Sequence, residues 1–179
     1  MIVERKYLAH FVDANMVHTL NASTLIPSGT TNYVRLGKHL ESYSEEMNPQ
    51  IEQHKNILGD PVVIHGGYQP SGSVDTYYAE KTGEEGDNEP LYDALQRIVL
   101  ERLSGDDTLT TCVDAMISVG TETTIEWAYK EDCYIAVQSF GGDTKGVQIP
   151  FKLIKSGNRQ KVVFTKSGTA WRITGVDNS

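Results

Sequence analysis

The most regular feature of the sequence is an alternation of apolar and polar residues that begins after position 108. One face of the segment 109–119 carries Leu109, Val113, Ala115, Ile117 and Val119. Successive side chains of a β-strand point to opposite faces, so this period predicts a strand. Residues 123–129 and 133–140 continue the same style. The chain after Gly105 is therefore expected to be mainly antiparallel β-structure.

The end of the chain has the pattern of further strands joined by turns. A glycine-rich turn at 141–146 precedes the run 147–153, in which Pro150 lacks the amide hydrogen of a ladder bond. We expect that strand to be an edge or to be bulged at Pro150. Residues 161–164 and 169–176 flank a Ser167-Gly168 turn, which predicts a final hairpin.

One segment has the period of an amphipathic helix instead. Its apolar face consists of Leu91, Leu95, Ile98, Val99 and Leu103. Asn88 suits the N-cap, Pro90 suits the first turn, and Gly105 supplies a stop. We expect a helix at about 90–103 that packs this face against the sheet.

The segment before the helix combines two strand-like runs with a glycine-rich connection. Residues 61–64 and 73–78 flank the sequence Gly-Gly-Tyr-Gln-Pro-Ser-Gly at 66–72. This arrangement predicts a strand, a tight reversal and a second strand, that is, a hairpin over 60–78. The glycines could also suggest a phosphate cradle, but no Gly-Lys-Ser/Thr follows them, so a turn is the simpler interpretation.

The N-terminal third is less regular. Residues 1–32 are interpreted as an N-terminal arm with a first strand, and 33–179 as one β domain. The polar stretch 37–58 fits either a hairpin around Asn48-Pro49 or a helix with Ile51, His54 and Leu58 on one face, and an extended hairpin or loop is favoured. The predicted fold is a mainly β, antiparallel β-sandwich or barrel with one packed α-helix and an extended arm and loops.

Length and charge narrow the possible functions. The 179 residues contain 16 Lys and Arg against 24 Asp and Glu, which gives a formal net charge of -8. A field of this sign repels nucleic acid, so sequence-specific DNA binding is not expected. Neither a membrane span nor the apolar stretch of a signal peptide is visible, and the protein is expected to stay in the cytoplasm without membrane contact.

The candidate chemistry is sparse. Cys112 and Cys133 lie in apolar runs, where a thiol behaves as a small hydrophobe, and five histidines lack metal-binding spacing. There is no nucleophile elbow, so we expect no catalytic residues. Without metal-binding spacing or a complete phosphate-binding motif, we also expect no metal and no cofactor. Trp127 and Trp171 could form the sugar-stacking platform of a monomeric carbohydrate-binding module, although burial in the core or an interface is the simpler interpretation.

The residues around the glycine-rich connection carry a resemblance to a known family. They are Gly67, Tyr68, Pro70 and Ser71 after a short strand, the pair Tyr77 and Tyr78 in the next strand, and Pro90-Leu91-Tyr92 at the start of the helix. The order of these residues and elements resembles that of the major tail proteins, or tail tube proteins, of phages and prophages of Gram-positive bacteria. Outside 59–103 the similarity rests on the order of elements.

The resemblance implies a tail-tube-like fold and a structural virion protein that is not an enzyme. Such subunits self-assemble into stacked hexameric rings, and the hollow tube holds a tape measure protein and later conducts DNA without binding it specifically. A sheath protein is a further partner if the tail is contractile. The acidic residues expected at ring-ring contacts are Glu45, Glu46, Glu84, Glu85 and Asp87. The alternatives are the binding module above and, less favoured, a small hydrolase.

Overall fold

The computed structural model describes residues 3–16, 30–37, 40, 42–79 and 89–179. The elements in chain order are η1 (Arg5–Tyr7), β1 (Leu8–Asp13), β2 (Tyr33–Leu36), β3 (Ser44–Glu46), β4 (Pro49–Lys55), β5 (Pro61–Tyr68), β6 (Ser71–Val74), α1 (Glu89–Glu101), η2 (Gly105–Thr108), β7 (Leu109–Ile117), β8 (Ile125–Val137), β9 (Gly141–Asp143), β10 (Gly146–Gln148), β11 (Phe151–Ser167) and β12 (Ala170–Val176). Within these ranges no helix is long and apolar enough to cross a bilayer.

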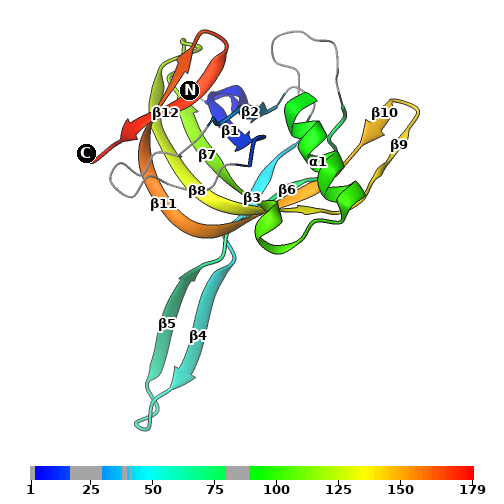
Figure 1. The fold of residues 1–179 in the computed structure, drawn as a ribbon. Helices are drawn as coiled ribbons and strands as arrows, with labels where there is room; N and C mark the ends of the chain where they lie inside the picture. Colours follow the sequence, from blue (N-terminus) through cyan, green and yellow to red (C-terminus); the bar gives the residue numbers. More distant parts are fainter. Residues whose placement is uncertain (1–2, 17–29, 38–39, 41, 80–88) are drawn as a thin grey trace.

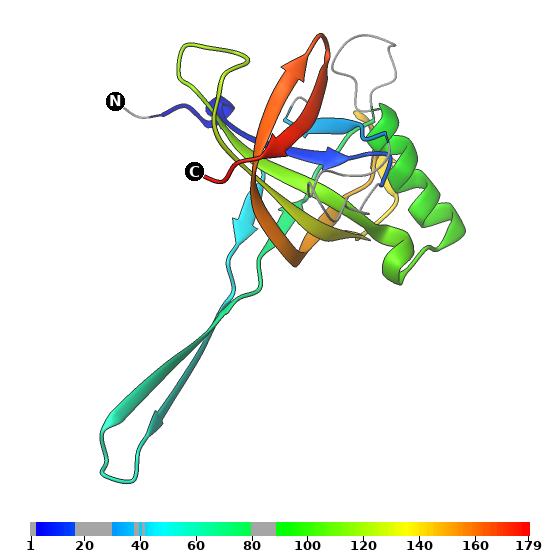
Figure 2. The ribbon, with the colours of Figure 1, turned by 60° about the vertical axis from the view of Figure 1, so that its left-hand side comes forward.

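The body is built on one eight-stranded antiparallel sheet. Its strand order is β2-β1-β7-β8-β11-β6-β3, with β12 paired to β11. The long strands β8 and β11 curve strongly, so that β12 folds back over one face while α1 covers the other (Figures 1 and 2). The described part of the sheet has two ends, at β2 and β3, and is not a closed barrel. The prediction of a mainly β, antiparallel fold with one packed helix is confirmed.

Both faces of the sheet are covered, which produces two cores. The first lies under α1 and contains Val12, Leu95, Cys133 and Phe151. The second lies under the β11–β12 hairpin and is rich in aromatic residues, namely Phe11, Tyr33, Phe164 and Trp171. The predicted alternation is confirmed within β7, where Val113, Ala115 and Ile117 all face the second core. It does not extend to Val119, which lies beyond the strand and is 47% exposed.

Strand β11 contributes to both cores because it changes parity. Phe151 and Leu153 face the first core, whereas Val162 and Phe164 face the second. Between them the pairing with β8 shifts register on both sides of Gly157, which has φ 112°, a conformation that a residue without Cβ adopts easily. Before the bulge the odd-numbered residues of β11 are buried, and after it the even-numbered residues are buried.

Two predicted boundaries are correct. Helix α1 ends at Glu101, close to the expected stop, and buries Leu91, Leu95 and Ile98. Val99 and Leu103 are partly buried against the same core. The final hairpin also forms as expected, with Ser167 paired to Ala170 across the turn. Pro150 lies between β10 and β11, where no ladder bond is required of it.

The predicted hairpin over 60–78 is wrong. Strand β5 extends through Tyr68 and pairs with β4, while β6 pairs with β3 and β11. The turn of the actual hairpin lies at 56–60, and β3 and β4 do not pair around Asn48-Pro49. Residues 8–13, within the segment interpreted as an arm with a first strand, form β1 between β2 and β7 and are almost completely buried.

Candidate assembly interface

The most prominent surface feature is the β4–β5 hairpin, which projects far from the body as a separate two-stranded ribbon (Figures 1 and 2). Every residue of β4 is exposed. The ribbon nevertheless carries apolar side chains in the open, among them Ile51, Val63 and Ile64, which are 51, 62 and 47% exposed. A polar ribbon would need no cover, but this one presents apolar surface to solvent.

The root of the hairpin is held by a compact turn. Asn48 has φ 44°, and its side-chain amide donates to the carbonyl of Gln69 at 3.1 Å. The Gln69 amide donates in return to the Met47 carbonyl at 3.2 Å. Asn tolerates this left-handed conformation better than most residues. The two strands thus leave the body together in a defined direction.

The strand that leads into the hairpin is fixed to the body by Tyr43. Its ring lies against the ring of His10, with 4.2 Å between the centroids. A Cβ built on Gly72 would lie 2.0 Å from the Tyr43 hydroxyl oxygen, so the tyrosine occupies the space that the glycine leaves open. Strand β3 follows directly and pairs with β6, with Ser44 opposite Ser73.

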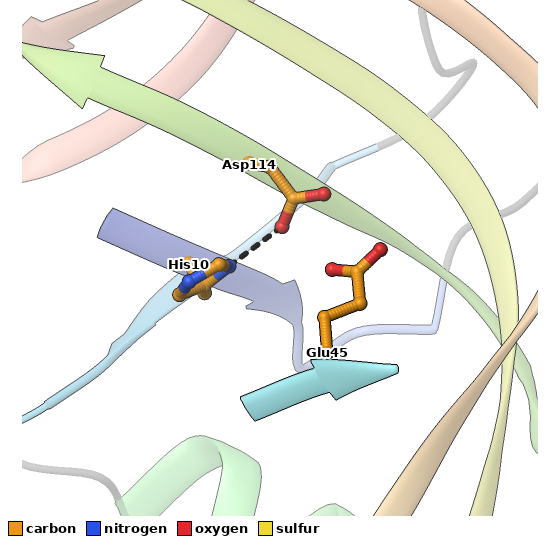
Figure 3. A group of neighbouring side chains, drawn as sticks. All are labelled: His10, Glu45 and Asp114. Carbon is orange, nitrogen blue, oxygen red and sulfur yellow. Dashed lines mark hydrogen bonds and ion pairs between the residues drawn. The ribbon is translucent and has the colours of Figure 1, made fainter. Parts of the chain in front are cut away.

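Beneath this strand lies a buried cluster of charged side chains. His10 Nδ1 is 2.7 Å from Asp114 Oδ1, as Figure 3 shows, and the imidazole nitrogen donates because the carboxylate can only accept. The Lys155 ammonium donates to Asp114 Oδ2 at 2.9 Å and lies 3.6 Å from Glu45 Oε2. Glu45 belongs to β3, so the cluster ties the hairpin root to the centre of the sheet.

Arg159 extends the cluster toward the surface. Its guanidinium donates to Glu131 at 2.9 Å, lies 3.6 Å from Asp114, and stacks over the Tyr129 ring at 4.7 Å. The cluster thus contains three carboxylates, two permanent cations and one histidine, namely Glu45, Asp114, Glu131, Lys155, Arg159 and His10. Buried charges of this kind are tolerated only when paired and hydrogen-bonded, which is the case here.

The pKa shifts follow from this arrangement. Burial alone raises the pKa of the Asp114 carboxyl, but the hydrogen bond from His10 and the Lys155 ammonium outweigh it and hold that pKa well below its usual range. Burial lowers the pKa of Lys155, yet the nearby Cys112 sulfur, Asp114 and Glu45 together raise it far above its ordinary value. The pKa of Glu45 is raised, first by burial and then by Asp114.

His10, Glu45 and Asp114 are also the described residues whose donor atoms come close enough to hold a metal ion, all within 4.8 Å of one another. However, the Lys155 ammonium already supplies the positive charge between the two carboxylates. A metal would have to displace it or share the space with a like charge. The cluster is therefore built as an ionic anchor, and its chemistry does not call for a metal.

The structure separates the residues of the family resemblance into two places. Gly67, with φ 106°, and exposed Tyr68 end β5 at the base of the hairpin, and Pro70 and Ser71 follow them directly there. Tyr77 is buried edge-to-face on Phe151, with 5.4 Å between ring centroids. The Tyr78 hydroxyl donates to Asp143 at 2.9 Å. The first four residues therefore lie at the base of the hairpin, whereas the two tyrosines pack against β11 and the β9–β10 hairpin.

Of the acidic residues predicted at ring-ring contacts, the two on β3 differ in their exposure to solvent. Glu46 is exposed on β3. Glu45 is turned inward, with 18% of its side chain exposed in the ion pair with Lys155. Glu84, Glu85 and Asp87 lie outside the described residues, as does the proposed N-cap Asn88.

Sequence reasoning missed the ionic cluster. His10 and Asp114 are 104 positions apart, and Asp114 lies 41 positions from Lys155. His10 stands in an apolar run and Asp114 on an alternating strand, so each is an ordinary residue locally. The one available signal was the presence of charged residues within otherwise apolar strands, which marks positions that require a partner.

No family model matches the chain, and no curated protein matches it. Among solved structures, the chain is similar to a cryo-EM structure of the PVC sheath/tube terminator of an extracellular contractile injection system in its extended state. The identity is 9% and the TM-score 0.47, over 91% of this chain and 98% of that one. A similarity at this level does not indicate a shared function.

Proposed function

We propose that the protein is a structural subunit of a phage tail tube that self-assembles into stacked hexameric rings and does no chemistry of its own. The proposal is supported by the motif around Gly67-Tyr68 and Pro70-Ser71, and by a curved antiparallel sheet with a single helix across one face. The subunit would act in the tail of the virion after assembly in the cytoplasm of the host bacterium.

The observation that carries this proposal is the β4–β5 hairpin. An isolated two-stranded ribbon is at best marginally stable in water. Both of its outer edges offer unpaired backbone groups, and its exposed side chains include Ile51, Val63 and Ile64. A second copy of the chain would satisfy the edges and cover the apolar surface at once, which is what an assembling subunit requires.

Closed symmetry gives the free edges a specific use. Strand β3 ends the main sheet and can pair with an edge of a neighbouring subunit around a ring. The hairpin then reaches to the next ring. The net charge of -8 suits a lumen through which DNA passes without adhering. The further partners of such a tube are a tape measure protein inside it and, in a contractile tail, a sheath outside it.

The alternative of a carbohydrate-binding module is weakened by the placement of the tryptophans. Trp171 is buried and stacks on Phe164, with 5.3 Å between ring centroids. Trp127 is half-buried beside Tyr129. A sugar platform needs flat aromatic faces that are open to solvent together, and these two residues do not provide one.

Light scattering and negative-stain electron microscopy on the purified full-length chain test the proposal. We expect rings or tubes for the native protein, and a folded monomer when Ile51, Val63 and Ile64 are all replaced by Thr, which keeps the β-propensity of the ribbon. Val119→Thr, at a similarly exposed position outside the hairpin, is the control and should assemble normally. A native protein that stays monomeric at all concentrations would contradict the proposal.

A further inference from the structure

A cavity of about 590 Å³ lies on the body beside the C-terminal end of α1. It is formed between the last turn of the helix, the following turn and the end of β8. The large apolar residues that line it are Ile98, Val99, Leu103, Ile135, Val137 and Phe140. Phe140 is 48% exposed, so the cavity opens to the surface with an aromatic side chain at its edge. Such a volume accommodates a few aliphatic side chains.

One cationic side chain lines the cavity, and two carboxylates lie in the turn beside it. Arg102 follows the helix with φ 52°, and its guanidinium has no ion-pair or hydrogen-bond partner within the described part of the chain. Asp106 and Asp107 lie in the turn that follows, where Asp106 accepts a hydrogen bond from the Tyr134 hydroxyl at 3.1 Å. The cavity is thus apolar inside, with a cation and two carboxylates nearby.

The tip of the hairpin has the complementary composition. Ile57 and Leu58 are 101 and 82% exposed, the highest values among the large apolar residues that the structure describes. The side-chain oxygen of Asn56 holds their turn, because it accepts hydrogen bonds from the backbone amides of Leu58 and Asp60, both at 2.9 Å. Lys55 and Asp60 flank the pair with one charge of each sign.

We propose that the hairpin tip of one copy inserts Ile57 and Leu58 into this cavity of a second copy. Asp60 then faces the free guanidinium of Arg102, and Lys55 faces the carboxylates of the turn at 105–108. This inference rests on the proposed self-assembly and deepens it by naming the acceptor site of the hairpin.

A second copy is the occupant because the same chain cannot supply the tip. The ribbon extends away from the body in both views, so its tip is remote from α1 of its own chain (Figures 1 and 2). The contact is therefore head-to-tail, with different surfaces on the two partners. Repetition of a head-to-tail contact generates rings or filaments, which matches the architecture expected of a tube.

Disulfide trapping tests the contact directly. The full-length double variant Leu58→Cys/Phe140→Cys, oxidised under assembly conditions, should give a ladder of covalent oligomers beyond the dimer on a non-reducing gel. The matched control Leu58→Cys/Val163→Cys places the second cysteine at a position that is 43% exposed and outside the cavity. The native cysteines are buried and free, so the native protein should give no ladder.

A charge exchange provides the second measurement. Arg102→Glu should reduce the assembled fraction several-fold at low salt by opposing Asp60 of the next copy, and Asp60→Lys in the same chain should restore it. If rings form but neither the ladder nor the rescue appears, the acceptor site is wrong while the proposed function stands. If the native chain never assembles, both proposals fail.

Discussion

Replacing Lys155 by methionine tests whether the buried ionic cluster anchors the sheet. The Lys155 side chain is 1% exposed, and its ammonium lies 2.9 Å from Asp114 and 3.6 Å from Glu45. Methionine keeps most of the aliphatic stem, so packing changes little. The substitution therefore removes the positive charge that lies beside the buried Asp114 carboxylate and the partly buried Glu45 carboxylate.

The expected magnitude follows from the distances. At an effective dielectric constant of about 20, the attraction between Lys155 and Asp114 at this separation is about 6 kcal/mol, and that to Glu45 about 5 kcal/mol. Removing the lysine also removes the cost of burying it, which is several kcal/mol. His10 and Arg159 still contact Asp114 and limit the damage. We expect a loss of about 3–5 kcal/mol in the free energy of unfolding at pH 7, as for other broken buried pairs.

The pH dependence has a defined sign. In the native protein the pKa of Asp114 is depressed below its ordinary 3.8, so its contribution to stability is fully present above that pH and is lost as the pH falls toward the folded pKa. The pKa of Glu45 is raised above 4.5, so its contribution has the opposite sign and favours the folded state below that pH. Without Lys155 both carboxyls take up protons more readily. The difference between native and variant protein should therefore be largest at pH 7 and shrink below pH 5.

Urea unfolding followed by tryptophan fluorescence measures this difference, because Trp171 lies in the second core. Lys152→Met on the same strand is the matched control, since Lys152 is exposed and should cost well under 1 kcal/mol. A loss at Lys155 that is no larger than at Lys152, or that does not shrink at low pH, would refute the anchoring role.

Two further substitutions have clear expected outcomes. Leu95→Asp places a charge at a completely buried helix position and should cost several kcal/mol of stability or abolish folding. Leu100→Asp, at a residue that is 66% exposed, should be tolerated. Circular dichroism of the two soluble fractions distinguishes these outcomes. Gly72→Ala would drive its Cβ into the Tyr43 ring, and urea unfolding should show a loss of about 1–3 kcal/mol in the free energy of unfolding. A Cβ at Gly175 meets nothing within 4 Å, so Gly175→Ala should leave the urea midpoint unchanged. Equal behaviour of the two variants within either pair would contradict the burial of Leu95 or the contact between Gly72 and Tyr43.

The hairpin shows where sequence patterns stop being informative. The run 61–64 has the residues of a strand, and it does form part of β5. Its partner could not be predicted, because a strand pattern specifies which side chains share a face and not which strand lies alongside. The glycines at 66 and 67 suggested a tight turn, yet Gly67 is the last glycine of a strand that runs on to Tyr68.

The elements with a local period could be predicted from the sequence. They are the strand at 109–117, the helical face of Leu91, Leu95 and Ile98, and the turn at Ser167-Gly168. Backbone geometry sets these periods within a few residues, so they are readable without a fold. It takes the packing of the strands in three dimensions to bury both faces of the sheet and to bring His10, Asp114 and Lys155 together. Charges from distant strands become one site when the sheet brings them within hydrogen-bonding distance in a medium of low dielectric constant, and no local pattern records that approach.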